Sequence, residues 1–322
     1  MTNVVRCVML CLAVAIMVGC SRKELTPKGS GRPYEVLLVG DTADVVGSAL
    51  TADVEGLPQA EPSFDVSICM QKDLNSITRL ARNIVIVQID SMQKERVKMS
   101  YEKNVWARNQ MIVRINASSL EALRQEMRSL GPKLRELLTR KEMNVEIALL
   151  SRKHNVEATK QIEKMFGVRM LVPSNLRSSK KGEQFLWFSN NSIGGMKNLC
   201  IYCVPIGSKS LAVSRDSVMK RNMQGETDEM YMQTVTESVS ERAIREHGKV
   251  VIVSRGLWEM HGDAMGGPFV SHAIADSSAQ RLIVAEAFVY APEGQKRNRL
   301  HALEASLFTL RMVDSAACET KE

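Results

Sequence analysis

The chain has 322 residues, of which 44% are hydrophobic and 25% are charged, as in ordinary globular proteins. Its length suits one large domain or two modest ones. The formal net charge of +7 is spread over both halves, so neither half is basic enough to indicate a nucleic-acid-binding domain. Seven cysteines in a chain of this length also exclude a disulfide-dense scaffold.

The first twenty residues predict export and lipid attachment. Arg6 supplies a positive start, residues 8–18 are apolar and uncharged, and a small residue stands directly before Cys20. This layout resembles bacterial lipoprotein signal peptides. The apolar stretch is shorter than the roughly 20 residues that span a bilayer, which favours a cleaved signal over a retained transmembrane helix. We therefore expect a signal peptide at 1–19, acyl chains such as palmitate on Cys20, and a short tether at 20–33.

The residues after Cys20 bear on which membrane holds the anchor. Ser21 stands where inner-membrane lipoproteins of some bacteria carry an Asp, and no acidic run of the kind found on some surface lipoproteins follows. This favours an outer-membrane anchor with the protein facing the periplasm. The inner membrane and the cell surface remain open.

Strand and helix patterns alternate across residues 34–154, which predicts an α/β half. The Val/Ile-rich run at 83–89 is typical of a strand that is covered on both faces. The expected strands are 34–39, 64–68, 83–89 and 111–115, and the expected short helices are 43–52 and 72–80.

A strong helical pattern begins at Ser118. Ser118 and Glu121 fit a capping box, and apolar residues follow at helical intervals. Gly131-Pro132 is expected to break or kink this run, and a second apolar helix then continues to Leu149.

Residues 155–322 predict a second half of a different kind. Helix 156–166 is expected to end at Gly167, four late strand signals separated by turns suit an antiparallel meander, and leucines from 300 to 310 predict a closing helix. The expected strands are 168–172, 185–189, 199–204, 230–239, 249–258, 268–274 and 281–290, with a helix at 211–223. The predicted fold class is α+β: an α/β-like N-terminal half with long helices, and a C-terminal half of mostly antiparallel sheet with packed helices.

Cys200 and Cys203 have the spacing of a redox pair. They lie in the apolar run 199–206, and residues three apart in a strand point to opposite faces of the sheet. We expect buried structural cysteines rather than a redox or metal site.

Residues 256–272 form the densest block of functional side chains, with four glycines, two carboxylates and two histidines. The first interpretation is a solvated hairpin loop, with Glu286 on the next strand at an edge or paired with a basic residue such as Arg255. The second is a ligand or partner groove. Its candidate residues are Trp258, Glu259, His261, Asp263, His272 and Glu286.

The third interpretation is a metal or hydrolytic site that uses His261, Asp263 and His272. A zinc site needs three or four ligands with supporting contacts, and no zinc-binding motif is present. We therefore assign no metal, cofactor or catalytic residue.

Several blocks of the sequence resemble one protein family. They are residues 31–37, 56–59, 61–64, 215–220, 255–260 and 262–272. These blocks resemble a family of bacterial lipoproteins known as domain of unknown function 4837, over nearly all of the mature chain. The resemblance implies a lipoprotein exposed to the periplasm and implies no catalytic residue.

The sequence thus predicts an exported, lipid-anchored envelope protein, and we expect a binding or interaction protein rather than an enzyme. Its expected partners are the membrane, through the lipid, and an envelope protein or ligand bound by the C-terminal half; nucleic acid is not expected. The alternative is a periplasmic hydrolase or metal-dependent enzyme that uses residues 256–272.

Overall fold

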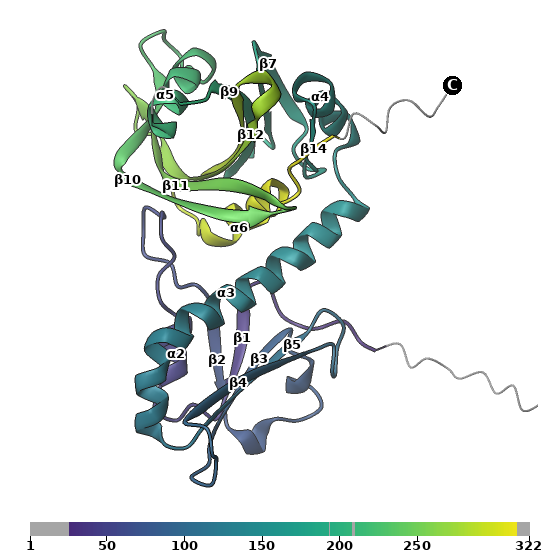
Figure 1. Ribbon diagram of the computed structural model, residues 1–322, viewed down its shortest axis with the longest axis vertical. Helices are drawn as coiled ribbons and strands as arrows, with labels where there is room; N and C mark the ends of the chain where they lie inside the picture. Colours follow the sequence, from purple (N-terminus) through teal and green to yellow (C-terminus); the bar gives the residue numbers. More distant parts are fainter. Residues whose placement is uncertain (1–25, 193, 208–209, 314–322) are drawn as a thin grey trace, which may run out of the picture.

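The computed structural model describes residues 26–192, 194–207 and 210–313. The protein has two halves, each built on one β-sheet, with a long helix between them (Figure 1). The architecture is α+β, which confirms the predicted fold class. The predicted signal peptide and Cys20 lie outside the described residues. Within the described ranges, no helix is long and apolar enough to cross a membrane.

The N-terminal half contains a five-stranded sheet in the order β2-β1-β3-β5-β4. Its pairs are parallel except for the edge strand β4, which runs antiparallel to β5. The strands are β1 (Glu35–Val39), β2 (Asp65–Cys69), β3 (Asn83–Ile89), β4 (Val97–Lys103) and β5 (Met111–Ala117). The first five residues of the central strand β3 are buried, as its Val/Ile composition predicts. Strand β4 was not predicted, because polar and charged residues dominate this exposed edge.

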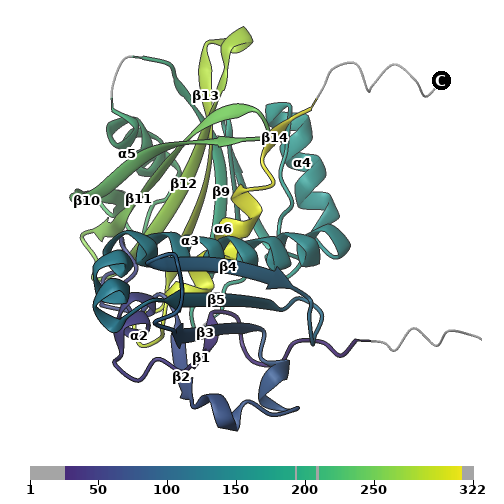
Figure 2. The same cartoon turned by 60° about the horizontal axis from the view of Figure 1, so that its bottom comes forward.

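Helices α2 (Val45–Leu50) and α3 (Leu120–Arg152) cover one face of this sheet. Ser119, and not Ser118, caps α3, since its side chain accepts a hydrogen bond from the Ala122 amide at 3.1 Å. Pro132 lies inside α3, so the two predicted long helices are one. Figures 1 and 2 show that α3 bends along its length, as expected for a proline that leaves a carbonyl unpaired. The expected helix at 72–80 is wrong: two short 3-10 turns, η1 (Gln71–Asp73) and η2 (Thr78–Leu80), occupy that segment.

The C-terminal half contains a seven-stranded antiparallel sheet in the order β10-β11-β12-β13-β9-β8-β7. The predicted meander is confirmed, because β10 to β13 are neighbours in chain order. The strands are β7 (Ser178–Gly182), β8 (Phe185–Ser189), β9 (Met196–Pro205), β10 (Tyr231–Glu246), β11 (Lys249–His261), β12 (Gly266–Asp276) and β13 (Arg281–Tyr290). Strand β7 was not predicted, since its sequence is polar and its residues are largely exposed.

The two faces of this sheet are covered by different helices. One face packs against α4 (Val156–Phe166) and α6 (Arg297–Leu307), and the other packs against α5 (Leu211–Asn222). Helix α4 ends at Gly167 with a left-handed φ of 69°, as predicted. The expected strand 168–172 shortens to β6 (Val168–Arg169), which pairs with β14 (Arg311–Met312), and η3 (Ser277–Ala279) joins β12 to β13.

Strand β9 separates the two cysteines of the apparent redox pair. Cys200 is buried in the core beneath α5, whereas Cys203 packs on the α4–α6 side. Their placement on opposite faces confirms the structural interpretation and rules out a disulfide between them.

Helix α3 connects the two halves. It packs on the five-stranded sheet on one side and on α6 on the other (Figure 2). The junction of the halves is therefore lined by α3, α6 and the strands nearest to α6.

Candidate functional site

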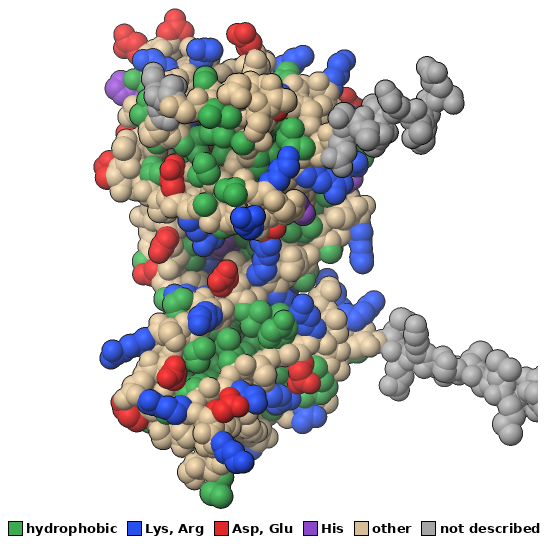
Figure 3. Space-filling model, in the orientation of Figure 1, with side chains coloured by type: hydrophobic (Ala, Val, Ile, Leu, Met, Phe, Trp, Pro, Cys, Tyr) green, Lys and Arg blue, Asp and Glu red, His purple; other side chains and the backbone are tan. Residues whose placement is uncertain are grey.

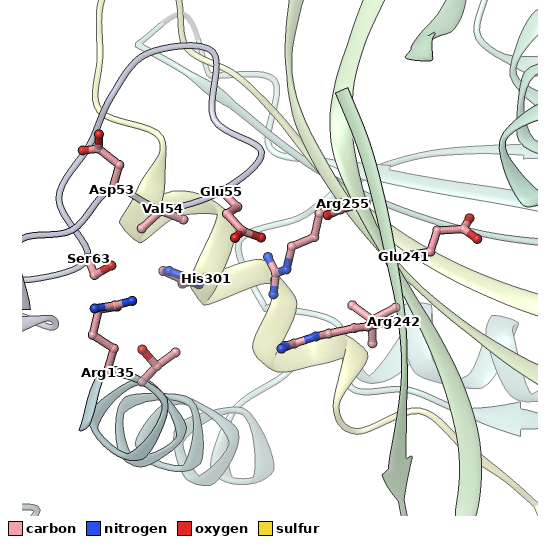
Figure 4. Close-up of a pocket in the computed structure, with 12 residues that line it drawn as sticks. Asp53, Val54, Glu55, Ser63, Arg135, Glu241, Arg242, Arg255 and His301 are labelled. Atoms are coloured by element: carbon pink, nitrogen blue, oxygen red, sulfur yellow. The ribbon is translucent and has the colours of Figure 1, made fainter. Parts of the chain in front are cut away.

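A cavity of about 380 Å³ lies at the junction of the two halves. Its walls come from the loop 53–63 of the N-terminal half, from α3, from the paired strands β10 and β11, and from α6 (Figure 4). On the face shown in Figure 3, both basic and acidic side chains lie around the narrow waist between the halves. The volume lies within the usual range of small-molecule sites, about 300–1,000 Å³.

Three arginines from three elements line this cavity: Arg135 of α3, Arg242 of β10 and Arg255 of β11. Arg135 donates a hydrogen bond to the Ala49 carbonyl at 2.6 Å. Arg242 is exposed and forms no ion pair with any residue that the structure describes. Because a guanidinium carries five N–H donors, Arg135 and Arg242 keep donors for a bound anion.

The acidic residues of the lining are not equally close to these arginines. Figure 4 shows the Glu55 carboxylate directed towards Arg255, whereas Glu241 points away. Glu241 instead accepts a hydrogen bond from the Ser254 hydroxyl at 3.0 Å. Asp53 is the third acidic residue of the lining. The cavity therefore offers guanidinium donors from Arg135 and Arg242, and carboxylate acceptors for a ligand N–H or O–H from Asp53 and Glu55.

Glu304 holds two of the cavity residues from behind. Its carboxylate is buried on α6, forms an ion pair with Arg255, and lies 3.4 Å from Nδ1 of His301. Nε2 of His272 lies 3.8 Å away and has no hydrogen-bond partner among the described residues. Burial alone would raise the pKa of Glu304, but Arg255 and the two histidines hold that pKa well below its ordinary value. An ionised Glu304 thus anchors Arg255 and His301.

The loop 53–63 is fixed to the C-terminal half by Glu61. Its carboxylate accepts hydrogen bonds from the backbone amides of Lys296 and Arg297, at 2.8 and 3.0 Å, where α6 begins. A carboxylate at a helix N-terminus satisfies free amides and complements the helix dipole. Arg297 also pairs with Asp65 at 2.8 Å. These contacts set the distance between the cavity walls.

His301 makes a further contact across the junction. Its ring stacks on Tyr34, with ring centroids 4.8 Å apart and an interplanar angle of 20°. Since Glu304 and Tyr34 hold the ring from two sides, its orientation at the edge of the cavity is fixed.

The arrangement can bind an anion. The described residues contain no group of three or more His, Cys, Asp or Glu side chains that could hold a metal ion. Guanidinium groups that converge on one cavity are typical of carboxylate and phosphate recognition.

The six residues predicted for a groove do not line one cavity, and that prediction is wrong. Trp258 and Glu286 are buried on the α5 side of the sheet, whereas His272 is buried against α6 on the opposite face. The reason is the strand register, which places Ser271 opposite Glu286 and sends His272 to the other face. Glu286 pairs with Arg215, and not with Arg255.

Glu259, His261 and Asp263 are exposed at and near the turn between β11 and β12. His261 stacks on Tyr231 at 4.9 Å, and Asp263 accepts a hydrogen bond from the Ala264 amide at 2.6 Å. These three residues therefore match the solvated hairpin of the first interpretation. The metal or hydrolytic set of His261, Asp263 and His272 is not assembled, because His272 is buried in the middle of β12.

Sequence reasoning did not find the residues of this cavity. Arg135, Arg242 and His301 stand in ordinary helix and strand patterns, and Arg255 was considered only as a partner for Glu286. One sequence signal could have pointed to Arg255: it is the first residue of the block 255–260, which is one of the blocks that resemble a known family.

The fold and the cavity define a two-part α+β protein with an arginine-lined cavity at the junction of its halves. Residues 155–309 match the domain of unknown function DUF4837, which confirms the resemblance for the C-terminal half. Residues 29–151 match a second domain of unknown function, DUF8532, so the N-terminal blocks assigned to the first family fall within another domain.

Solved structures show only distant similarity. A variant of protein Mog1 is 13% identical, with 47% of this chain and 93% of that chain covered and a TM-score of 0.29. The Saccharomyces cerevisiae Ran-binding protein Mog1p is 14% identical, with coverages of 47% and 92% and a TM-score of 0.29. A Bacteroides thetaiotaomicron VPI-5482 structure is 15% identical, with coverages of 47% and 46% and a TM-score of 0.25. TM-scores this low do not establish a shared fold. No curated protein matches it in sequence.

Proposed function

We propose that this chain is an exported, lipid-anchored envelope protein that binds a small polar anion in the cavity between its halves. The anchor rests on the pattern of residues 1–20, which ends in Cys20. The proposed placement is the outer membrane, with the two halves in the periplasm. The proposed role is binding rather than catalysis.

The observation that carries the binding proposal is the convergence of Arg135, Arg242 and Arg255. They come from three separate elements and line one cavity of about 380 Å³. Guanidinium groups bind the two oxygens of a carboxylate or phosphate in a parallel fork. An oxyanion that entered this cavity would meet donors from both halves of the protein.

The rest of the lining favours a polar ligand body. Glu55 and Ser63 supply oxygens from the N-terminal loop, while Val54 and Val253 are the apolar members of the lining. A ligand with an oxyanion at one end and hydroxyl or amino groups at the other would bind the arginines with its oxyanion and the oxygens of Glu55 and Ser63 with its donors.

Calorimetric titration of the purified protein with phosphate, sulfate, acetate and citrate tests this proposal, with choline as a cationic control. We expect saturable binding of at least one anion. Arg242→Gln should weaken it by about 1.5–3 kcal/mol, the usual worth of a hydrogen bond to a charged group. Arg221→Gln, an exposed substitution on α5, is the matched control and should bind as the parent does. Equal affinity in Arg242→Gln, or binding of none of the anions, would reject the proposal.

A further inference from the structure

A second cavity, of about 480 Å³, lies beside the C-terminal part of α3. Its walls are that part of α3, the turn between β10 and β11, strand β6, and the segment from the end of α6 to β14. It shares no lining residue with the cavity between the halves.

The rim of this second cavity is basic. The basic lining residues are Arg140, His154, Arg169, His247 and Arg311. Glu246 is the single acidic residue that the described part of the chain places in the lining, and its carboxylate is already paired with Arg140. The remaining rim therefore has an excess of positive charge.

Arg169 and Arg311 concentrate that charge at one point. They are directly opposite each other in the antiparallel pair β6–β14. Like charges in this position destabilise a strand pair, because their Cβ atoms are only about 4.5–5.5 Å apart. Arg169 has a partner in Glu163 at 3.3 Å, but Arg311 forms no ion pair within the part of the chain that the structure describes. An anion between the two guanidinium groups would remove this repulsion.

The two imidazoles of the rim are held by backbone carbonyls. Nδ1 of His154 lies 3.1 Å from the Leu150 carbonyl oxygen, and Nε2 of His247 lies 3.2 Å from the Phe308 carbonyl oxygen. Because a carbonyl oxygen only accepts hydrogen bonds, the nitrogen that faces it in each ring carries a proton. The second nitrogen of each ring takes no part in these carbonyl bonds. The rings are thus positioned as fixed parts of the wall.

The floor of the cavity is apolar. Ile147, Leu171 and Phe308 line it and pack on a buried cluster below. The Arg140 guanidinium lies over the Phe308 ring, 4.7 Å from its centroid. An apolar floor beneath a basic rim suits a ligand that is apolar at one end and anionic at the other.

We propose that this second cavity binds a small amphipathic anion. Its oxyanion headgroup lies between Arg169 and Arg311, and its short apolar body lies on Ile147, Leu171 and Phe308. The headgroup is a carboxylate or a phosphate, which share the chemistry that guanidinium groups recognise.

Octanoate and octyl phosphate are the probes, measured by calorimetric titration against the full chain. Acetate tests whether the headgroup binds without the apolar body, and octanol tests whether the apolar body binds without a charge. Octyltrimethylammonium tests whether a positive headgroup is rejected. We expect saturable binding of octanoate, octyl phosphate or both, with roughly tenfold or greater weakening when either end is removed or the charge is reversed. The preferred probe identifies the headgroup.

Arg311→Gln is the decisive variant. It should weaken binding roughly tenfold or more, as expected for the loss of a charge-assisted hydrogen bond. Its melting temperature should equal or exceed that of the parent, because the substitution removes a like-charge contact. Arg152→Gln, exposed on the same helix α3 but outside the lining, is the matched control and should change neither quantity.

Three results would overturn the proposal: no saturable binding of either probe, equal binding of octanol, or unchanged affinity in Arg311→Gln. A lower melting temperature in Arg311→Gln would show that the opposed arginines serve the fold rather than a ligand.

Discussion

Arg215 and Glu286 form a buried ion pair, although they are 71 positions apart in the chain. The shortest guanidinium–carboxylate distance is 2.7 Å, and both side chains are almost fully excluded from solvent. The Tyr202 hydroxyl donates a further hydrogen bond to Glu286 at 3.0 Å, and the guanidinium carbon of Arg215 lies 4.3 Å from the centroid of the Phe269 ring. Burial alone would lower the pKa of Arg215, but Glu286 raises it above its ordinary value. The pair joins α5 to the face of the seven-stranded sheet that α5 covers.

Removal of one partner should destabilise the protein strongly. Glu286→Ala leaves the Arg215 guanidinium buried without its counter-charge, so we expect a loss of about 3–5 kcal/mol in the free energy of unfolding. Urea denaturation measures it. Glu259→Ala, an exposed substitution on strand β11 of the same sheet, is the control and should stay within about 0.5 kcal/mol of the parent. A small loss in Glu286→Ala would show that the pair contributes little to the fold.

Glu304 predicts how stability depends on pH. Arg255, His272 and His301 keep its folded-state pKa well below the ordinary value, in spite of burial. A lowered folded-state pKa means that the carboxylate stabilises the fold fully above its unfolded pKa, near 4.5, and that this contribution is lost as the pH falls towards the folded pKa. The stability difference between the parent and Glu304→Gln should therefore be constant above about pH 6 and shrink below about pH 5. Urea titrations at several pH values measure the difference, and one that does not change with pH contradicts the prediction.

Gly267, within the block 256–272, allows close packing of two strand backbones. A Cβ on Gly267 would lie 2.1 Å from the Val289 carbonyl oxygen on the neighbouring strand, so β12 and β13 would have to separate. We expect Gly267→Ala to cost about 1–3 kcal/mol, the range for an overpacked core. Gly194→Ala is the control, since a Cβ there would meet nothing within 4 Å. Equal melting temperatures for the two variants would contradict this account.

Local patterns predicted the elements whose apolar residues repeat regularly. Strand 281–290 and helix 156–166 have the bounds that the sequence predicts, because alternation and helical spacing depend only on neighbouring residues. The edge strands β4 and β7 were missed because their exposed polar residues carry no such signal. The cavity was missed for another reason: its three arginines converge only through the packing of α3 and α6 between two sheets, which no local pattern encodes.

Burial should make Cys200 unreactive. Burial, and secondarily the charge of Glu286, raise the pKa of its thiol well above the ordinary value, so the nucleophilic thiolate is absent at neutral pH. Iodoacetamide labelling followed by peptide mass spectrometry should find Cys200 unmodified in the native protein and modified in urea. Equal labelling under both conditions would place Cys200 outside the core.

The lipid anchor proposed from the sequence is tested at Cys20. Two or more acyl chains hold a protein on a membrane stably, since each buried CH₂ contributes about 0.8 kcal/mol. Cys20→Ala removes the attachment atom, so the variant should either leave the membrane fraction or accumulate with its signal peptide still present. Cys69→Ala changes a cysteine of the folded body and should fractionate as the parent does. Mass spectrometry of the parent should find a lipidated Cys20 as the first residue. Unchanged size and membrane retention in Cys20→Ala would mean that something other than acyl chains holds this protein at the envelope.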